Sequence, residues 1–441
     1  MIIPRAKRIR GRLTLPGDKS ISHRAAIIAA IANGISRIRN YSTSADCAST
    51  LTCLRELGVR IERNRADILV HGVGDNVLQP PNQELNCGNS GTTMRLLAGV
   101  LAGQSFTAEL TGDESLRKRP MQRIIEPLEM MGARISSSNG HAPLEITGRK
   151  PLQAIDYELL IASAQVKSCI LLAALNAEGR TVVIENEPTR DHTERMLGLF
   201  GALIQSGVAQ REPANARFAA IAGPAQLRAC EILIPGDISS AAYFIAAAAL
   251  LPGSSLEVKQ VGVNPTRILF LKQLRAAGFD LAVSDVQEGN NEPVGHVTVR
   301  GVERPQRPGN FELPFKLEGS LIPQLIDELP LLAVVGSQIQ NGIEIRNAKE
   351  LRAKESDRIA ATVENLRAMG AEVEEFGDGL RVNGSTRLRG ARIDPRGDHR
   401  IAMAFSVAAL IAEGETEITD AECVGVSFPE FFDLIETIIE R

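Results

Sequence analysis

Residues 175–183 read Leu-Asn-Ala-Glu-Gly-Arg-Thr-Val-Val, and variants of this stretch recur along the chain. In each copy an Ala/Leu/Ile-rich run reaches a glycine, and a short β-branched segment follows. The six glycines, 69 to 89 residues apart, are Gly34, Gly103, Gly179, Gly253, Gly342 and Gly414. Glycine tolerates the positive φ of a helix C′ position, and Ile, Val and Thr favour strands. Each copy therefore predicts a helix, a glycine turn and a strand.

A second glycine joint between a helix and a strand appears in five of the six copies. Its glycines are Gly58, Gly132, Gly201, Gly278 and Gly370. Each repeat then reads as strand, buried helix, strand, outer helix and strand pair, and the sixth copy ends at Arg441 inside its outer helix. The first helix of each repeat is apolar nearly all round and should be buried. Repeats of this size must pack on one another, and three plus three gives two ordinary domains. Coincidence among common glycine-ended helices is the competing interpretation.

The bulk composition bounds the class of protein. The chain has 441 residues, 44% of them hydrophobic, so two or three domains are expected. A formal charge of −4, no Trp and 3 Tyr argue against partners such as nucleic acid or a membrane surface. The N-terminus has no apolar signal core, and no apolar run approaches the roughly 20 residues of a membrane span. The six cysteines form no CxxC pair, so we expect free thiols in a cytoplasmic protein.

The segments that precede the six buried helices are polar and differ from one another. They are residues 17–24, 88–93, 163–168, 236–240, 326–329 and 397–400. A helix N-terminus presents unpaired N–H groups and a partial positive charge, so it can bind an anion. Six such ends directed at one cleft would form a strongly electropositive pocket. For any single segment, and for Ser239 and Ser240 in particular, plain N-capping is the competing interpretation.

Basic side chains strengthen the anion-site interpretation of the first segment. Ser20 and Arg24 share a helix face at a spacing of four, so Lys19, Ser20 and Arg24 resemble a phosphate clamp more than a cap.

Further basic residues could belong to the same site or to solvated, ion-paired surfaces. These are Arg119 in the cationic loop 117–120, Arg190 ahead of a candidate helix, and Lys354 and Arg358 on one helix face. The sequence has no P-loop, no HExxH, no Gly-x-Ser-x-Gly and no Cys/His cluster with metal-ligand spacing. A nucleoside-triphosphate site and a metal centre are therefore not expected.

The ordered set of these motifs resembles the EPSP synthase family over essentially the full length. The matching segments are residues 15–25, 88–92, 119–121, 163–165, 354–358 and 398–400. The resemblance implies an α+β fold of two inside-out α/β barrel domains, each with three βαβαββ repeats. It places residues 1–18 and 237–441 in one domain and 19–236 in the other, with the active site in the cleft between them.

The family resemblance also implies a reaction. The enolpyruvyl group of phosphoenolpyruvate is transferred to the 5-hydroxyl of shikimate 3-phosphate through a tetrahedral intermediate, a step towards chorismate and the aromatic amino acids. No metal or organic cofactor is required, the partners are the two small substrates, and a monomer is expected. The alternatives are the sister reaction on UDP-N-acetylglucosamine, whose loop cysteine has no counterpart near Arg119, and a repeat-built binding protein for RNA ends.

Site residues follow from the resemblance position by position. The implied shikimate 3-phosphate contacts are Lys19, Ser20, Arg24, Ser163, Ala164, Gln165, Arg190, Asp327 and Lys354. The implied phosphoenolpyruvate contacts are Lys19, Gly91, Arg119, Gln165, Arg358 and Arg400. The implied catalytic residues are Asp327 as the base, Glu355 as the candidate proton donor, and Lys19. No neighbour in the sequence offers Asp327 a counter-charge.

Three positions depart from the best-known subgroup of the family and resemble a divergent bacterial one. Ala164 stands where a second serine is common, and Leu96 where some members have proline. Val426 replaces a lysine that reaches phosphoenolpyruvate in many members, so no role is transferred to it.

The family resemblance places Gly91 against the pocket that phosphoenolpyruvate and the herbicide glyphosate both occupy. We predict a glyphosate-sensitive enzyme in which Gly91→Ala weakens glyphosate far more than it raises the KM for phosphoenolpyruvate, because a methyl group penalises the longer ligand most. Competitive inhibition constants for both proteins test this. An equal loss for both ligands would instead indicate that Gly91 only supplies a turn with positive φ.

Overall fold

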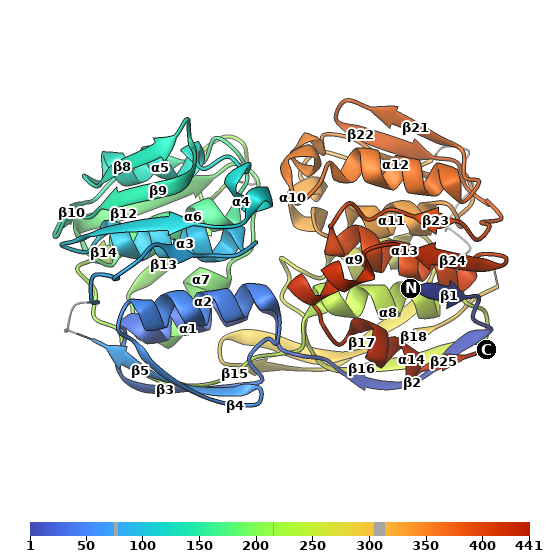
Figure 1. Ribbon diagram of the computed structural model, residues 1–441, viewed down its shortest axis with the longest axis horizontal. Coiled ribbons are helices and arrows are strands. Elements are labelled where there is room, and N and C mark those ends of the chain that lie inside the picture. Colours follow the sequence, from blue (N-terminus) through green and yellow to red (C-terminus); the bar gives the residue numbers. More distant parts are fainter. Residues whose placement is uncertain (75–77, 215, 304–313) are drawn as a thin grey trace. The chain divides into compact units, whose positions relative to one another are not determined.

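The computed structural model describes residues 1–74, 78–214, 216–303 and 314–441. Contacts divide the chain into two compact units, coloured along the sequence in Figure 1. The first unit holds Met1–Leu15, Pro235–Gln287 and Pro293–Arg441, and the second holds Pro16–Ile234 with Glu288–Glu292. The start of the chain therefore belongs with its C-terminal half.

The second unit is built from buried helices, outer helices and small sheets. Its buried helices are α1 (Lys19–Ile31), α3 (Gly91–Ala102) and α6 (Ala164–Ala174), and the others are α2 (Ala45–Glu56), α4 (Glu114–Arg117), α5 (Gln122–Met130) and α7 (His192–Leu199). One sheet has the order β15 (Glu231–Leu233), β3 (Asn33–Arg39), β5 (Asp67–Val73), β4 (Arg60–Asn64). The next has β6 (Leu85–Asn86), β7 (Thr107–Thr111), β9 (His141–Thr147), β8 (Arg134–Ser138). The last has β10 (Leu152–Gln153), β12 (Ala177–Glu185), β14 (Arg217–Gly223), β13 (Ile204–Val208), with β11 (Asp156–Glu158) also on β12.

The first unit repeats this plan. Its buried helices are α8 (Ile238–Leu250), α11 (Leu329–Gly336) and α13 (His399–Ile411), and the others are α9 (Leu269–Ala276), α10 (Leu321–Leu325), α12 (Arg358–Ala368), α14 (Phe431–Glu436) and the 3₁₀ turns η1 (Lys349–Ala353) and η2 (Ala421–Val426). One sheet has the order β17 (Asp280–Gly289), β18 (Glu292–Arg300), β16 (Ser255–Gly262), β2 (Arg8–Thr14), β25 (Ile439–Glu440). The others are β19 (Phe315–Leu317), β20 (Ile343–Ile345), β22 (Gly379–Val382), β21 (Val373–Phe376), and β1 (Ile2–Pro4), β24 (Glu415–Ile418), β23 (Arg392–Ile393).

One pairing pattern recurs in these sheets. A strand that precedes a buried helix pairs in parallel with the strand that follows the helix, as β6 does with β7 and β19 with β20. An antiparallel partner then extends the sheet, as β9 and β22 do. The parallel pair requires a crossover, and the buried helix is that crossover. The predicted α+β class is confirmed.

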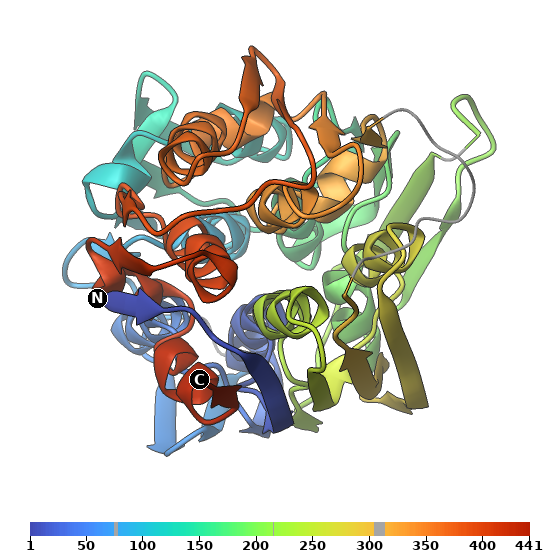
Figure 2. The same ribbon diagram turned by 90° about the vertical axis from the view of Figure 1, so that its right-hand side faces the viewer.

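The two ends of the chain complete the first unit together. Strand β1 pairs antiparallel with β24, and β2 pairs antiparallel with the terminal β25. The blue and red segments accordingly lie side by side in Figure 2. The prediction that the chain ends inside a helix is wrong, because α14 stops at Glu436 and the last residues find an open edge of β2.

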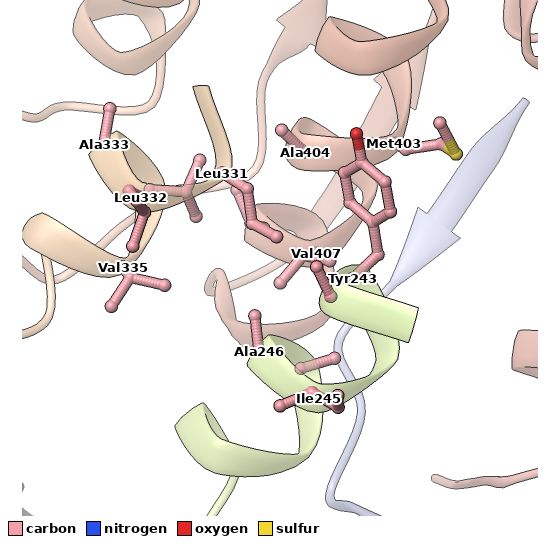
Figure 3. Packing of buried hydrophobic residues seen from close by; sticks show 14 of the residues in the cluster. Tyr243, Ile245, Ala246, Leu331, Leu332, Ala333, Val335, Met403, Ala404 and Val407 are labelled. Atoms are coloured by element: carbon pink, nitrogen blue, oxygen red, sulfur yellow. The ribbon is translucent and has the colours of Figure 1, made fainter. Parts of the chain in front are cut away.

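The buried helices pack closely through small side chains. In the first unit α8, α11 and α13 contact one another, and Figure 3 shows Ala246, Leu331 and Val407 in their shared core. In the second unit a Cβ added to Gly99 of α3 would lie 2.2 Å from the carbonyl oxygen of Cys169 in α6. This closeness explains why the helices are rich in Ala and Gly. Their predicted burial is confirmed.

The two sets of joint glycines behave differently. The five glycines of the second joint each follow the C-cap residue of an outer helix, with φ between 85° and 103°, so they are true C′ glycines. The C′ prediction is wrong for the first set. Gly34 lies within β3 because Ala32 is already extended, and Gly103 is itself the C-cap of α3 with φ of −90°.

Two further sequence expectations bear on the environment of the chain. All six cysteines lie in the described part of the chain and are free thiols, as predicted. Among the described residues, no helix is long and apolar enough to cross a membrane.

Gly370 allows the stability cost of a positive φ at these glycines to be measured apart from side-chain packing. It has φ of +89°, and an added Cβ meets no described atom within 4 Å, so only backbone strain opposes alanine there. We predict that Gly370→Ala lowers the free energy of unfolding of the first unit by about 1–2 kcal/mol. This is the usual cost of holding a residue that has a Cβ in the left-handed region of backbone conformation. Gly377→Ala is the matched control, because that site is equally open and has no positive φ. Urea unfolding of both variants measures the difference, and equal losses would contradict the strain argument.

Candidate active site

Side-chain caps begin most of the buried helices. The capping residues are Asp18, Ser90, Ser163, Asp237 and Asp398. The capping interpretation is therefore correct for these segments, but in α8 the cap is Asp237 and not Ser239 or Ser240. Capping accounts for the Asp and Ser residues and leaves the basic residues near them unexplained.

Basic side chains gather around the first turn of α1. Arg24 is buried, and its Nε donates to Thr193 Oγ1 at 2.7 Å while its Nη1 donates to the Ser20 carbonyl at 2.9 Å. Arg190 Nη1 lies 3.5 Å from Ser20 Oγ. Lys19 Nζ pairs with Asp46 at 2.8 Å. The arrangement brings cations to a helix N-terminus, which suits a phosphate group.

The electrostatics of Arg24 favour an anion beside it. Burial is the main cause that lowers the pKa of Arg24 to about 10, and repulsion from Arg190 lowers it further, against the attraction of Glu194, Asp18 and Glu292. A bound anion would offset the repulsion between the two arginines.

The start of α6 is tied to α3 through Gln165. Its Nε2 donates to Thr92 Oγ1 at 2.8 Å, and its Oε1 accepts from Arg95. Ser163 caps the helix, and Ala164 is the first helical residue. Sequence reasoning missed Arg95. The signal available was its spacing of four from Gly91 on α3, which places both on one helix face.

Gly91 begins α3 between two arginines. A Cβ at this position would lie 3.0 Å from Arg95 Nη1 and 3.4 Å from Arg119 Nη1. Arg119 is itself held by Asn89, whose Oδ1 accepts from Nη2 at 2.6 Å. The competing interpretation of Gly91 as a turn with positive φ is wrong, because the residue is helical. An alanine there would press on the guanidinium groups.

In the first unit, Asp327 lies between two buried arginines. Its Oδ1 is 3.7 Å from Arg358 Nη1, and its Oδ2 is 3.6 Å from Arg400 Nη2. No sequence neighbour offers Asp327 a counter-charge, and folding supplies both partners from positions distant in the sequence. Burial lowers the pKa of Arg400, but the attraction of Asp327 and other acids is larger and holds it well above its usual value.

Arg358 connects the other residues of this cluster. It is 1% exposed, and it donates to Asp398 Oδ2 at 2.8 Å from Nε and to Glu355 Oε2 at 2.6 Å from Nη2. Burial opposes the charge, yet Asp398 and Glu355 raise the pKa of Arg358 above its usual value. Lys354 Nζ donates to Glu350 at 3.2 Å. Carboxylates thus balance the arginines in this cluster.

Lys167 is a second residue that sequence reasoning left without a role. It is 1% exposed in α6 and pairs with Glu185 at 2.9 Å and Glu194 at 2.7 Å. Glu185 also accepts from Thr189, in the segment that carries Arg190. The available signal was a lysine inside an otherwise apolar buried helix. The triad anchors the Arg190 segment to α6.

The chemistry of these clusters defines a class of site. In the described part of the chain no group of three or more His, Cys, Asp or Glu side chains could hold a metal ion. Both units instead present arginine and lysine beside helix N-termini, and the first adds carboxylates held by arginine. Such residues suit an enzyme that binds small, multiply charged anions and moves protons on them.

Comparisons with known proteins agree with that class and make it specific. The family model for EPSP synthase (3-phosphoshikimate 1-carboxyvinyltransferase) matches residues 3–435. The chain is 49% identical over 437 residues to the 3-phosphoshikimate 1-carboxyvinyltransferase of Koribacter versatilis, covering 99% of this chain and 98% of that protein. The corresponding protein of Bacillus licheniformis is 43% identical over 98% of both chains.

A solved structure gives the same result. EPSP synthase from Acinetobacter baumannii superposes with a TM-score of 0.84 at 39% identity, over 99% of this chain and 97% of that one. The chain belongs to the EPSP synthase family of transferases. The family identification made from the motifs is confirmed, and the UDP-N-acetylglucosamine alternative is not favoured.

The Lys167 triad yields a stability prediction. Lys167→Met leaves Glu185 and Glu194 buried without their cation, and breaking a buried pair in this way costs about 3–5 kcal/mol. The cost arises because the two carboxylates lose the cation that offsets their burial.

A surface pair provides the control. Lys118→Met removes the exposed ion pair with Glu114 and should leave the free energy of unfolding unchanged. Thermal and urea unfolding of both variants measure the effect. A Lys167→Met loss as small as that of Lys118→Met would contradict the assignment.

Proposed function

We propose that this chain transfers the enolpyruvyl group of phosphoenolpyruvate to the 5-hydroxyl of shikimate 3-phosphate, releasing phosphate. The observation that carries the proposal is the match of the family model to nearly the full chain. Relatives called 3-phosphoshikimate 1-carboxyvinyltransferase are 49% and 47% identical to it. The charged groups of the helix starts support it, because the two substrates together bring two phosphates and two carboxylates.

The proposed shikimate 3-phosphate contacts centre on α1 and α6. Lys19, Ser20, Arg24 and Arg190 cluster as a phosphate clamp requires, and the capped start of α6 adds further donors. The remaining proposed contacts are Ser163, Ala164, Gln165, Asp327 and Lys354.

The proposed phosphoenolpyruvate contacts are arginine-rich. Arginine binds carboxylate or phosphate through two parallel hydrogen bonds, so a rigid guanidinium fixes the substrate's orientation. Phosphoenolpyruvate would be bound by Lys19, Gly91, Arg119, Gln165, Arg358 and Arg400.

Proton transfer falls to two carboxyl groups in this scheme. Asp327 takes the proton of the 5-hydroxyl of shikimate 3-phosphate while the hydroxyl oxygen adds to C2 of phosphoenolpyruvate. Glu355 delivers a proton to C3 of phosphoenolpyruvate. Loss of a proton from C3 and departure of phosphate then complete the transfer. Arg358 and Arg400 beside Asp327 favour the ionised form that a base needs.

We also propose that each unit is an inside-out barrel of three βαβαββ repeats, which the recurring sheet pattern supports.

A three-substrate assay tests the function. The purified chain, given phosphoenolpyruvate, should release phosphate steadily with shikimate 3-phosphate and not with UDP-N-acetylglucosamine or RNA. Turnover with the UDP sugar would favour the sister reaction, and the absence of turnover with shikimate 3-phosphate would overturn the proposal.

Asp327 gives the sharpest prediction for the chemistry. Asp327→Ala should lower kcat by about 10²–10⁴-fold, the usual contribution of a general base, while shikimate 3-phosphate binding stays measurable by calorimetry. Asp433→Ala, which removes an exposed acid of the same unit, is the control and should retain full activity. An Asp327→Ala enzyme that keeps more than roughly a tenth of the wild-type kcat would exclude Asp327 as the base.

A further inference from the structure

Glu328 is a buried acid next to the proposed base that has no assigned role. It is 4% exposed and stands at the start of α11, but its side chain makes no capping bond to that helix. Its carboxylate reaches other elements instead. Oε1 accepts from Ser239 Oγ of α8 and lies 3.9 Å from Arg400 Nη1 of α13.

Arg267 approaches the same carboxylate from the other side. This residue, between β16 and α9, is 4% exposed, and its Nη2 is 3.8 Å from Glu328 Oε1. Within the described residues, its Nε and Nη1 have no hydrogen-bond partner. A buried guanidinium so incompletely paired stabilises a fold poorly, because its desolvation is not offset. The arrangement therefore indicates a role other than stability.

The geometry at Ser239 links Glu328 to Arg400. The Ser239 hydroxyl has one proton and donates it to Glu328, so its lone pairs are left to accept from Arg400 Nη1 at 3.0 Å. Arg400 Nη1 also donates to the Asp327 carbonyl at 3.3 Å. Glu328 thus acts on Arg400 directly through charge and indirectly by orienting a hydroxyl.

We propose that Glu328, held in place by Arg267, is a positioning residue that fixes the Arg400 guanidinium for phosphoenolpyruvate. The inference rests on the proposed function, in which Arg400 binds that substrate. Arg267 draws the carboxylate from one side and Arg400 from the other, so the acid keeps one position. Neither Glu328 nor Arg267 needs to touch a substrate in this scheme.

Neutral polar variants test the pair. Glu328→Gln removes the charge and keeps an oxygen that can accept from Ser239, and Arg267→Gln removes the partner charge. Each should raise the KM for phosphoenolpyruvate by about 10- to 100-fold, the range expected when a supporting residue is lost, and change the KM for shikimate 3-phosphate by less than about threefold. The double variant should be no worse than the worse single one, because both act through one contact.

Glu344→Gln is the matched control. Glu344 is also a buried acid of the first unit in an ion pair with arginine, since Arg381 Nε donates to it at 2.8 Å. Its loss should lower the melting temperature and leave both KM values unchanged. A purely structural role for Glu328 would give the same result as this control.

The outcomes separate the inference from the function it rests on. A wild-type chain without transfer activity overturns the proposed function. An active wild type whose variants keep the phosphoenolpyruvate KM, raise both KM values equally, or combine additively overturns the inference alone. If Glu328→Gln or the double variant does not fold, the comparison of Arg267→Gln with Arg267→Lys decides. The first removes the charge that attracts Glu328 and should raise only the phosphoenolpyruvate KM, whereas the second keeps that charge and should stay nearer the wild-type KM. Equal KM values for the two variants would overturn the inference.

Discussion

The compensation of buried charge is the constraint on which the rest of this structure depends. Arg24, Arg358 and Arg400 are each less than a tenth exposed, although an isolated ion is strongly destabilised away from water. Each is held by oxygens. Arg24 has hydroxyls and a carbonyl, Arg358 has carboxylates, and Arg400 has a hydroxyl, a carbonyl and nearby carboxylates. This pairing leaves the guanidinium groups charged and rigid before any substrate arrives, and a catalytic site that stabilises anions needs that preorganisation.

The packing of the buried helices buries these charged groups and also brings together the side chains that compensate them. Small residues let α3 and α6 approach so closely that Gly99 has no room for a Cβ beside Cys169. Close packing removes water from the first turns, where the helix dipole and free N–H groups are concentrated. Side chains from neighbouring helices then meet at these ends, as Arg95 of α3 does with Gln165 of α6.

The two units compensate their charges differently. Around α1 the pKa of Arg24 is lowered chiefly by burial and further by repulsion from Arg190. Around α11 and α13 acids balance the arginines, so the first unit combines cations for binding with carboxylates for proton transfer. Lys167 shows a third solution, in which an ion triad lies wholly within the packed core and anchors a loop.

Local rules determined much of this protein from the sequence alone. Glycines after outer helices, apolar runs that become buried helices, and Asp or Ser caps depend on a few adjacent residues, so they could be predicted, as could the family from its ordered motifs. The tertiary structure alone decided that β1 pairs with β24 and β25 with β2, that Asp327 sits between Arg358 and Arg400, and that Glu328 meets Arg267. These contacts join residues far apart in the chain. These strand pairings and ion pairs form only when the whole chain has folded, and no local pattern of residues encodes which buried charges will meet.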